Sequence, residues 1–152
     1  MIRIICVGQK PPQWVVEASQ VYVKRLKHTW PVEIIDVDHD RSQTANLRKE
    51  KESQRLLYVM SQCAGVHILL DIAGKSMNSE CFAQSIQDIK DRGQSISFII
   101  GGSDGVSDKI VQQSHQRLSL SQLTFPHSFA RVMLLEQIYR SHCIQTNHPY
   151  HK

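Results

Sequence analysis

The sequence predicts one α/β domain built on a largely parallel sheet with helices on both faces. Short apolar runs alternate with longer segments of helical spacing along the whole chain. Parallel strands need crossover connections, and helical crossovers cover both faces of such a sheet. No linker, repeat or low-complexity stretch interrupts this alternation, and 152 residues is an ordinary length for one domain. We therefore expect a single domain over residues 1–152.

Strands are expected where apolar, β-branched residues run together, and helices where apolar residues recur every three or four positions. The expected strands span residues 2–7, 32–37, 66–72 and 96–100. The expected helices span residues 14–28, 45–63, 78–91, 107–114 and 128–143. Residues 118–125 alternate apolar and hydroxyl side chains up to Pro126.

Composition describes an ordinary globular protein, with 41% hydrophobic and 21% charged residues. The formal net charge of +4 suits an anionic partner but is too common to identify one. The N-terminus has no signal-peptide pattern, and no apolar run approaches the ~18 residues of a membrane span, so we expect a cytoplasmic protein. The four cysteines (Cys6, Cys63, Cys81 and Cys143) lack zinc-ligand spacing and are expected to be buried apolar residues.

Three strand ends carry residues typical of a ligand site: 70–75, 101–105 and 118–125. If the three strands are neighbours, these segments form one cleft at the carboxyl edge of the sheet. Gly74-Lys75-Ser76 is not a phosphate loop, because Leu69 stands where that motif needs its first glycine. Three glycines within residues 101–105 do not match the dinucleotide fingerprint, but they favour a ligand loop.

The histidines and arginines near the C-terminus can each be explained without a functional role. His148 and His151 have no third partner at metal-ligand spacing, so we expect no metal. Composition alone would place Arg131 and Arg140 on a solvated helix face, and Tyr139 could belong to the core. From the residues alone, the sequence therefore indicates an α/β domain with a mildly basic, glycine-lined cleft.

The second half of the chain carries an ordered set of short segments: Leu70-Asp71, Gly74-Lys75, 98–102, 118–127, 130–132, 136–140 and 147–152. Together these segments resemble the ribosomal RNA large subunit pseudouridine N3-methyltransferase family, a branch of the SPOUT class of knotted methyltransferases. The resemblance covers the whole chain, and it is the order of the segments on a chain of this length that makes it specific. It implies a C-terminal trefoil knot, which is very rare and which no periodicity would predict.

The resemblance also implies a homodimer that binds S-adenosyl-L-methionine in the knot, with the catalytic site near the dimer interface and no metal. Glycines 101 and 102 would admit close backbone approach, and apolar side chains would wall the adenine. The implied cofactor residues are Leu70, Gly101, Gly102, Leu120, Ser121, Gln122, Leu123, Thr124 and Phe125.

The implied reaction is methyl transfer to N3 of a pseudouridine in a stem-loop of large-subunit (23S) ribosomal RNA within the assembled ribosome. His151 and Tyr150 would be candidates for accepting the N3 proton, and Arg140 would stabilise the developing charge. Arg131 and Lys152 would contact RNA phosphates. Two alternatives stay open: a knotted methyltransferase acting on tRNA, which the Pro149-Tyr150-His151 ending disfavours, and a non-catalytic α/β RNA-binding module.

Overall fold

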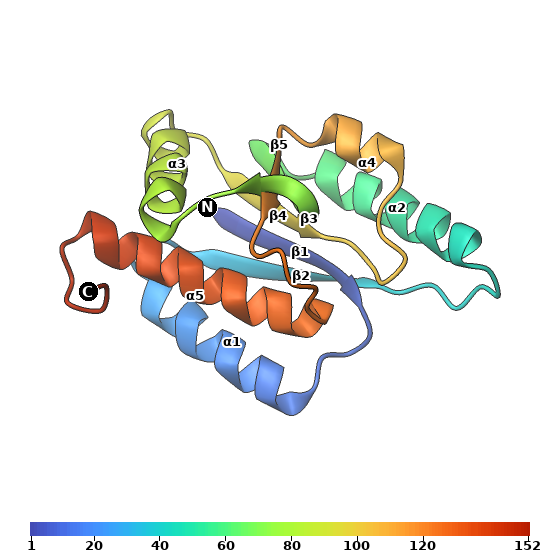
Figure 1. Ribbon diagram of the computed structural model, residues 1–152, viewed down its shortest axis with the longest axis horizontal. Coiled ribbons are helices and arrows are strands. Elements are labelled where there is room, and N and C mark those ends of the chain that lie inside the picture. The colour runs from blue at the N-terminus through green and yellow to red at the C-terminus, as the bar shows by residue number, and fades with distance from the viewer.

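The computed structural model describes residues 1–152 and confirms a parallel sheet between two layers of helices (Figure 1). The sheet has five parallel strands in the order β2-β1-β4-β3-β5. The strands are β1 (Ile2–Gly8), β2 (Val32–Asp38), β3 (Val66–Ser76), β4 (Ile96–Ile100) and β5 (Gln116–Ser119). The helices are α1 (Gln13–Leu26), α2 (Ala45–Ser61), α3 (Ser79–Asp91), α4 (Asp108–Gln113) and α5 (His127–Gln145).

Each face of the sheet has its own apolar core, because successive side chains of a strand point to opposite faces. Ile4 of β1 belongs to the larger core, which α1, α3 and α5 close. Its neighbour Ile5 belongs to the smaller core under α2 and α4. All five residues of the central strand β4 are buried, as expected for a strand covered on both faces.

Two helices begin where a short polar side chain accepts a backbone N–H that the first turn leaves free. The Thr44 hydroxyl accepts from the Leu47 amide at 3.3 Å and starts α2. The Asn78 side chain accepts from the Cys81 amide at 2.8 Å and starts α3. Pro126 precedes α5, which runs beside α1 (Figure 1). No helix is long and apolar enough to cross a membrane.

The third strand is longer than the apolar pattern predicted. The pattern ends at residue 72, but β3 continues to Ser76 because its pairing with β5 resumes after a register shift. Leu70 and Lys75 both pair with Leu118, so residues 71–74 form a bulge that periodicity cannot reveal. Conversely, only the first two residues of the 118–125 segment belong to a strand, since β5 ends at Ser119.

Gly74 marks a close crossing of two chain segments. A Cβ atom at this position would lie 2.7 Å from backbone atoms of Arg117 and Leu118. Backbone atoms cannot rotate away, so Gly74→Ala is expected to lower the free energy of unfolding by about 1–3 kcal/mol, the range for overpacking. Denaturant titration measures this loss. Gly8→Ala is the control, because nothing lies within 4 Å of a Cβ there, and an equal loss in both variants would contradict the crossing.

Candidate active site

The three segments singled out in the sequence leave the sheet at the same edge. Neighbouring strands β4, β3 and β5 are all parallel, with Leu69 opposite Ile99 and Leu70 opposite Leu118. Gly101 and Leu120 therefore lie just beyond the ends of β4 and β5, and Leu70 lies in β3 directly before its bulge. This confirms that the strands are neighbours, and it places the segments where open parallel sheets bind ligands.

Helix α2 holds the glycine loop 101–105 and the start of α4 through three contacts. Arg48 Nε lies 2.7 Å from Asp104 Oδ2. The Ser107 amide donates to the Ser53 hydroxyl at 2.9 Å. Glu52, which is 4% exposed, places Oε2 against Gly102, at 2.1 Å from the position of a Cβ atom there. Gly102 is therefore a glycine because a buried carboxylate fills the side-chain space.

The two carboxylate oxygens of Glu52 differ, because one is held by a hydrogen bond and the other has no hydrogen-bond partner. Its Oε1 accepts the Asp40 amide at 2.9 Å, whereas its buried Oε2 has no hydrogen-bond partner. The first bond prevents the side chain from swinging away from the glycine loop. Glu52 was not singled out in the sequence, where it is one of several charged residues on a helix.

Segment 120–125 presents backbone groups to a ligand. The Ser119 hydroxyl donates to the Ser121 carbonyl at 2.9 Å, and the Leu123 amide donates to the Ser121 hydroxyl at 3.0 Å. The amides of Gln122 and Thr124 make no hydrogen bond within the chain. Leu123 is 69% exposed, while Leu120 and Phe125 are half-buried. Free amides beside apolar side chains suit an uncharged heterocycle such as adenine.

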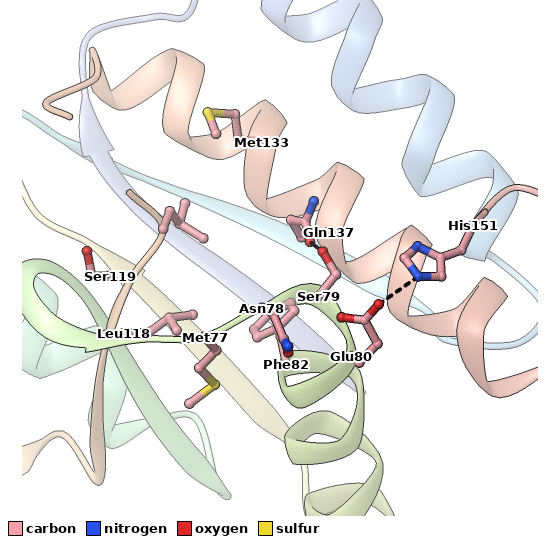
Figure 2. Close-up of a pocket in the computed structure, with 11 residues that line it drawn as sticks. Met77, Asn78, Ser79, Glu80, Phe82, Leu118, Ser119, Met133, Gln137 and His151 are labelled. Atoms are coloured by element: carbon pink, nitrogen blue, oxygen red, sulfur yellow. Dashed lines mark hydrogen bonds and ion pairs between the residues drawn. The ribbon is translucent and has the colours of Figure 1, made fainter. Parts of the chain in front are cut away.

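A cavity of about 380 Å³ opens between the end of β5, the start of α3 and helix α5. Figure 2 shows Leu118 and Ser119 on one side of this cavity and His151 on the other, with Glu80 and Gln137 between them. Leu120 is the one predicted cofactor residue that lines this cavity. The cavity therefore joins the tail to the cofactor segment that follows β5.

The three predicted catalytic residues lie in one hydrogen-bonded network. His151 Nε2 is 3.0 Å from Glu80 Oε1, and His151 Nδ1 is 3.4 Å from an Arg140 nitrogen (Figure 2 draws the first pair). Arg140 also pairs with Glu136, whose Oε1 accepts the Tyr150 hydroxyl at 3.0 Å. Arginine can only donate, so Nδ1 is the acceptor and the Nε2 proton points to Glu80.

Sequence reasoning missed the two carboxylates of this network. Glu136 stands four residues before Arg140, a spacing at which opposite charges meet on a helix, so the pair was detectable. Glu80 was not detectable, because it meets His151 across 71 positions of sequence. A carboxylate on one imidazole nitrogen fixes the tautomer and favours the protonated ring, as in catalytic triads.

Tyr150 is poorly suited to accept a proton. Burial raises the pKa of its hydroxyl far above the usual value, and hydrogen bonds to Tyr22 and Glu136 raise it further. The hydroxyl therefore stays protonated near neutral pH and donates to Glu136. Of the two predicted candidates, the geometry favours His151 as the base.

The two predicted RNA-contacting residues differ in accessibility. Lys152 is exposed at the end of the chain. Arg131 is only 7% exposed and its guanidinium is paired with Asp36, so the expectation of a solvated side chain is wrong for Arg131. A buried, paired guanidinium is not positioned for a phosphate contact, since binding phosphate would mean breaking the ion pair.

The cysteines follow the sequence interpretation with one exception. Cys6, Cys63 and Cys143 are buried as expected, and burial raises the pKa of the Cys6 thiol to about 11. Cys81 is exposed, because it lies on the outward side of the first turn of α3. No group of three histidine, cysteine or acidic side chains could hold a metal ion.

The fold and its edge site define a class of methyltransferase. The chain belongs to the SPOUT methyltransferases: the family model described as "Predicted SPOUT methyltransferase" matches residues 1–151. Two solved structures share the fold at low identity. A probable methylase family protein from Haemophilus influenzae has a TM-score of 0.62 at 10% identity, covering 99% of this chain and 70% of that one. A putative methylase family protein from Neisseria gonorrhoeae has a TM-score of 0.57 at 11% identity, covering 91% and 81%.

Within that class, the most informative relatives share one name, ribosomal RNA large subunit methyltransferase H. The protein of that name from Francisella philomiragia is 36% identical over 154 residues, covering 99% of both chains. The one from Fusobacterium nucleatum is 37% identical over 153 residues, again covering 99% of both. The match is full-length, so it includes the segments predicted to bind the cofactor and the C-terminal tail.

Proposed function

We propose that this protein transfers a methyl group from S-adenosylmethionine to N3 of a pseudouridine in a stem-loop of large-subunit (23S) ribosomal RNA, on assembled ribosomes in the cytoplasm. The observation that carries the proposal is the tail network of Glu80, His151, Arg140, Glu136 and Tyr150 beside the strand ends. It supplies a base, His151, that lines the cavity beside the end of β5, and a cation, Arg140, in contact with that base. The full-length relatives named as ribosomal RNA methyltransferases support the substrate class.

The cofactor would lie at the carboxyl edge of β3, β4 and β5. The free amides of Gln122 and Thr124 and carbonyls of the same segment would hold the adenine, with Leu70, Leu120 and Phe125 as apolar contacts. Gly101 and Gly102 would form one wall of the site with their backbone, because Val106 and Glu52 fill the space beside the two glycines and hold the loop in place. When bound, S-adenosylmethionine supplies an electrophilic methyl group on a sulfonium, so no metal is needed.

The protein's own contribution to the reaction is alignment and handling of one proton. The cavity walls would hold the base so that its N3 faces the methyl group, which is catalysis by proximity. His151 Nδ1 would take the N3 proton while Glu80 stabilises the resulting imidazolium through Nε2. Arg140 would turn from Nδ1 toward a carbonyl oxygen of the base, where negative charge develops. Lys152 would contact a phosphate.

We further propose that the chain acts as a homodimer through the face formed by α1, α5 and β2. Trp14 and Phe129 are 50% and 40% exposed there, with ring centroids 6.4 Å apart. A cavity of about 280 Å³ opens between the same elements, lined by residues such as Val16 of α1, Val32 of β2 and Arg131 of α5. The buried Ser19 hydroxyl in its wall has no hydrogen-bond partner. An apolar face with an unsatisfied polar group is typical of a surface that another chain covers.

Disrupting this face is expected to separate the protomers. Trp14→Glu would place a charge in the apolar patch, and loss of one aromatic anchor weakens association by about 2 kcal/mol or more, roughly 30-fold in Kd. Sedimentation across protein concentration measures the shift. Tyr58→Glu is the matched control, because Tyr58 is a 71% exposed aromatic residue on α2, over the opposite face. A wild-type monomer at all concentrations would contradict the proposal.

The trefoil knot is part of the same proposal. It is supported by the close approach at Gly74, where residues 71–74 bulge against the backbone of β5 and Lys75 and Ser76 then pair with it. A threaded chain of this kind is expected to refold slowly, since the tail must pass through a loop already formed. Double-jump refolding measures this, and a single fast phase would count against threading.

Two alternatives predict different labelling patterns. With labelled S-adenosylmethionine and a mixture of ribosomes and bulk tRNA, the proposal predicts label in large-subunit ribosomal RNA. Label in tRNA instead would identify a tRNA methyltransferase. A non-catalytic module would neither transfer label nor gain stability from the cofactor, whereas a binding protein gains about 2.7 kcal/mol at a ligand concentration 100 times Kd.

A further inference from the structure

A larger groove, of about 980 Å³, runs between α3 and the open edge of the sheet formed by β5. The residue pair Met77 and Asn78 lines both this groove and the cavity that contains His151. The groove therefore leads directly to the proposed catalytic site. None of the catalytic or cofactor residues discussed above lies in it.

The groove is basic and polar. Lys75, Arg92 and Arg117 line it against one acidic residue, Asp88, whereas the whole chain has 18 basic and 14 acidic residues. Lys75 and Arg92 are exposed and make no ion pair, so their charges are available to a ligand. Arg117 pairs with Asp71 at 2.7 Å and is held at the groove wall.

We propose that this groove binds the ribose–phosphate backbone of the RNA strand next to the methylated nucleotide. The inference rests on the proposed function, because it names how that substrate approaches the site. Unpaired cations beside polar side chains such as Gln94 suit phosphate and ribose oxygens. No tyrosine, phenylalanine or tryptophan lines the groove, so it lacks the large aromatic rings of a base-stacking platform and would hold mainly the backbone.

A protein partner fits this surface less well. Centres of protein–protein interfaces are enriched in aromatic residues and depleted in lysine. The groove has no such aromatic anchor, and four of its 15 lining residues are hydrophobic. Nucleic-acid interfaces, in contrast, are polar and positively charged.

Charge reversal in the groove tests the proposal directly. The double variant Lys75→Glu/Arg92→Glu is compared with wild type for binding a fluorescein-labelled single-stranded RNA of about 12 nucleotides at several salt concentrations. We expect at least about tenfold weaker binding in the variant and a salt slope shallower by about 1.4, since each lost phosphate contact removes about 0.7. Lys109→Glu on α4, in the other helix layer, is the matched control and should bind within about twofold of wild type.

Cys81 provides a second readout that needs no charge change. It lines the groove and is the one exposed cysteine, so its alkylation rate reports whether the groove is covered. Unmodified ribosomes and the RNA oligonucleotide should both slow alkylation of Cys81. A cysteine placed at position 109 by Lys109→Cys, in a Cys81→Ser background, should react at the same rate with and without RNA.

The outcomes separate the groove from the catalytic proposal. Equal RNA affinity in the groove variant and the control, with Cys81 unprotected, would overturn the inference. Protection by ribosomes but not by RNA alone, with unchanged RNA affinity, would also overturn it and indicate a ribosomal protein as occupant. RNA binding in the groove without methyl transfer by wild type would support the groove while rejecting the proposed function.

Discussion

Replacing His151 with alanine is expected to lower the rate of methyl transfer by about 10²–10⁴-fold, the usual contribution of a general base. The affinity for S-adenosylmethionine should stay within about twofold, because His151 lies across the cavity from Leu118 and Ser119, and no residue of segment 121–125 lines that cavity. Single-turnover kinetics with ribosomes measures the rate, and calorimetry measures cofactor affinity. An unchanged rate would remove His151 from the mechanism.

Two further variants distinguish proton transfer from general disturbance of the tail. His148→Ala changes an exposed histidine three positions earlier, and it should keep nearly full activity. Glu80→Gln should lower the plateau rate by about tenfold. It should leave the affinity for S-adenosylmethionine within about twofold, because Glu80 contacts His151 and no residue of segment 121–125. A loss of cofactor affinity as large as the loss of rate would assign Glu80 a purely structural role.

Gly102→Ala is expected to lower stability by about 1–3 kcal/mol and cofactor affinity by about tenfold or more. The new methyl group would collide with Glu52 Oε2, which cannot retreat because Oε1 is held by the Asp40 amide. The glycine loop must then move, and it forms one wall of the proposed cofactor site. Thermal unfolding with and without S-adenosylmethionine measures both effects.

A double-mutant cycle with Glu52→Ala tests the physical cause of that loss. Removing the Glu52 carboxylate opens the space that the new methyl group at position 102 would need. In the Glu52→Ala background, Gly102→Ala should therefore cost much less than it does in the wild type. Equal costs in the two backgrounds would show that the contact with Glu52 is not the reason for glycine at this position.

The fold was largely predictable because its signals are local. Apolar runs such as Ile2–Gly8 and Ile96–Ile100 indicate buried strands from a few consecutive residues. N-cap residues such as Asn78 directly precede the helices that they begin. The bulge at 71–74 was not predictable, since it depends on pairing between β3 and β5. The knot came from resemblance alone, because no periodicity encodes the path of a chain through a loop.

The site was predictable only in part for the same reason. Resemblance identified His151, Tyr150 and Arg140, and the structure places them together. It did not reveal Glu80 or Glu52, whose roles arise from contacts across long stretches of sequence. For Arg131 the expectation was wrong rather than missing. A basic residue on a helix was expected to be solvated, but Arg131 is buried and paired with Asp36.

The most direct test of the central claim is transfer of labelled methyl from S-adenosylmethionine to three substrates lacking the modification: assembled ribosomes, free large subunits and naked ribosomal RNA. We predict that label enters one pseudouridine of a large-subunit stem-loop, detected as N3-methylpseudouridine by mass spectrometry, mainly with assembled ribosomes. Cofactor binding without label in any of the three would contradict the ribosomal substrate. Absence of cofactor binding as well would contradict methyl transfer itself.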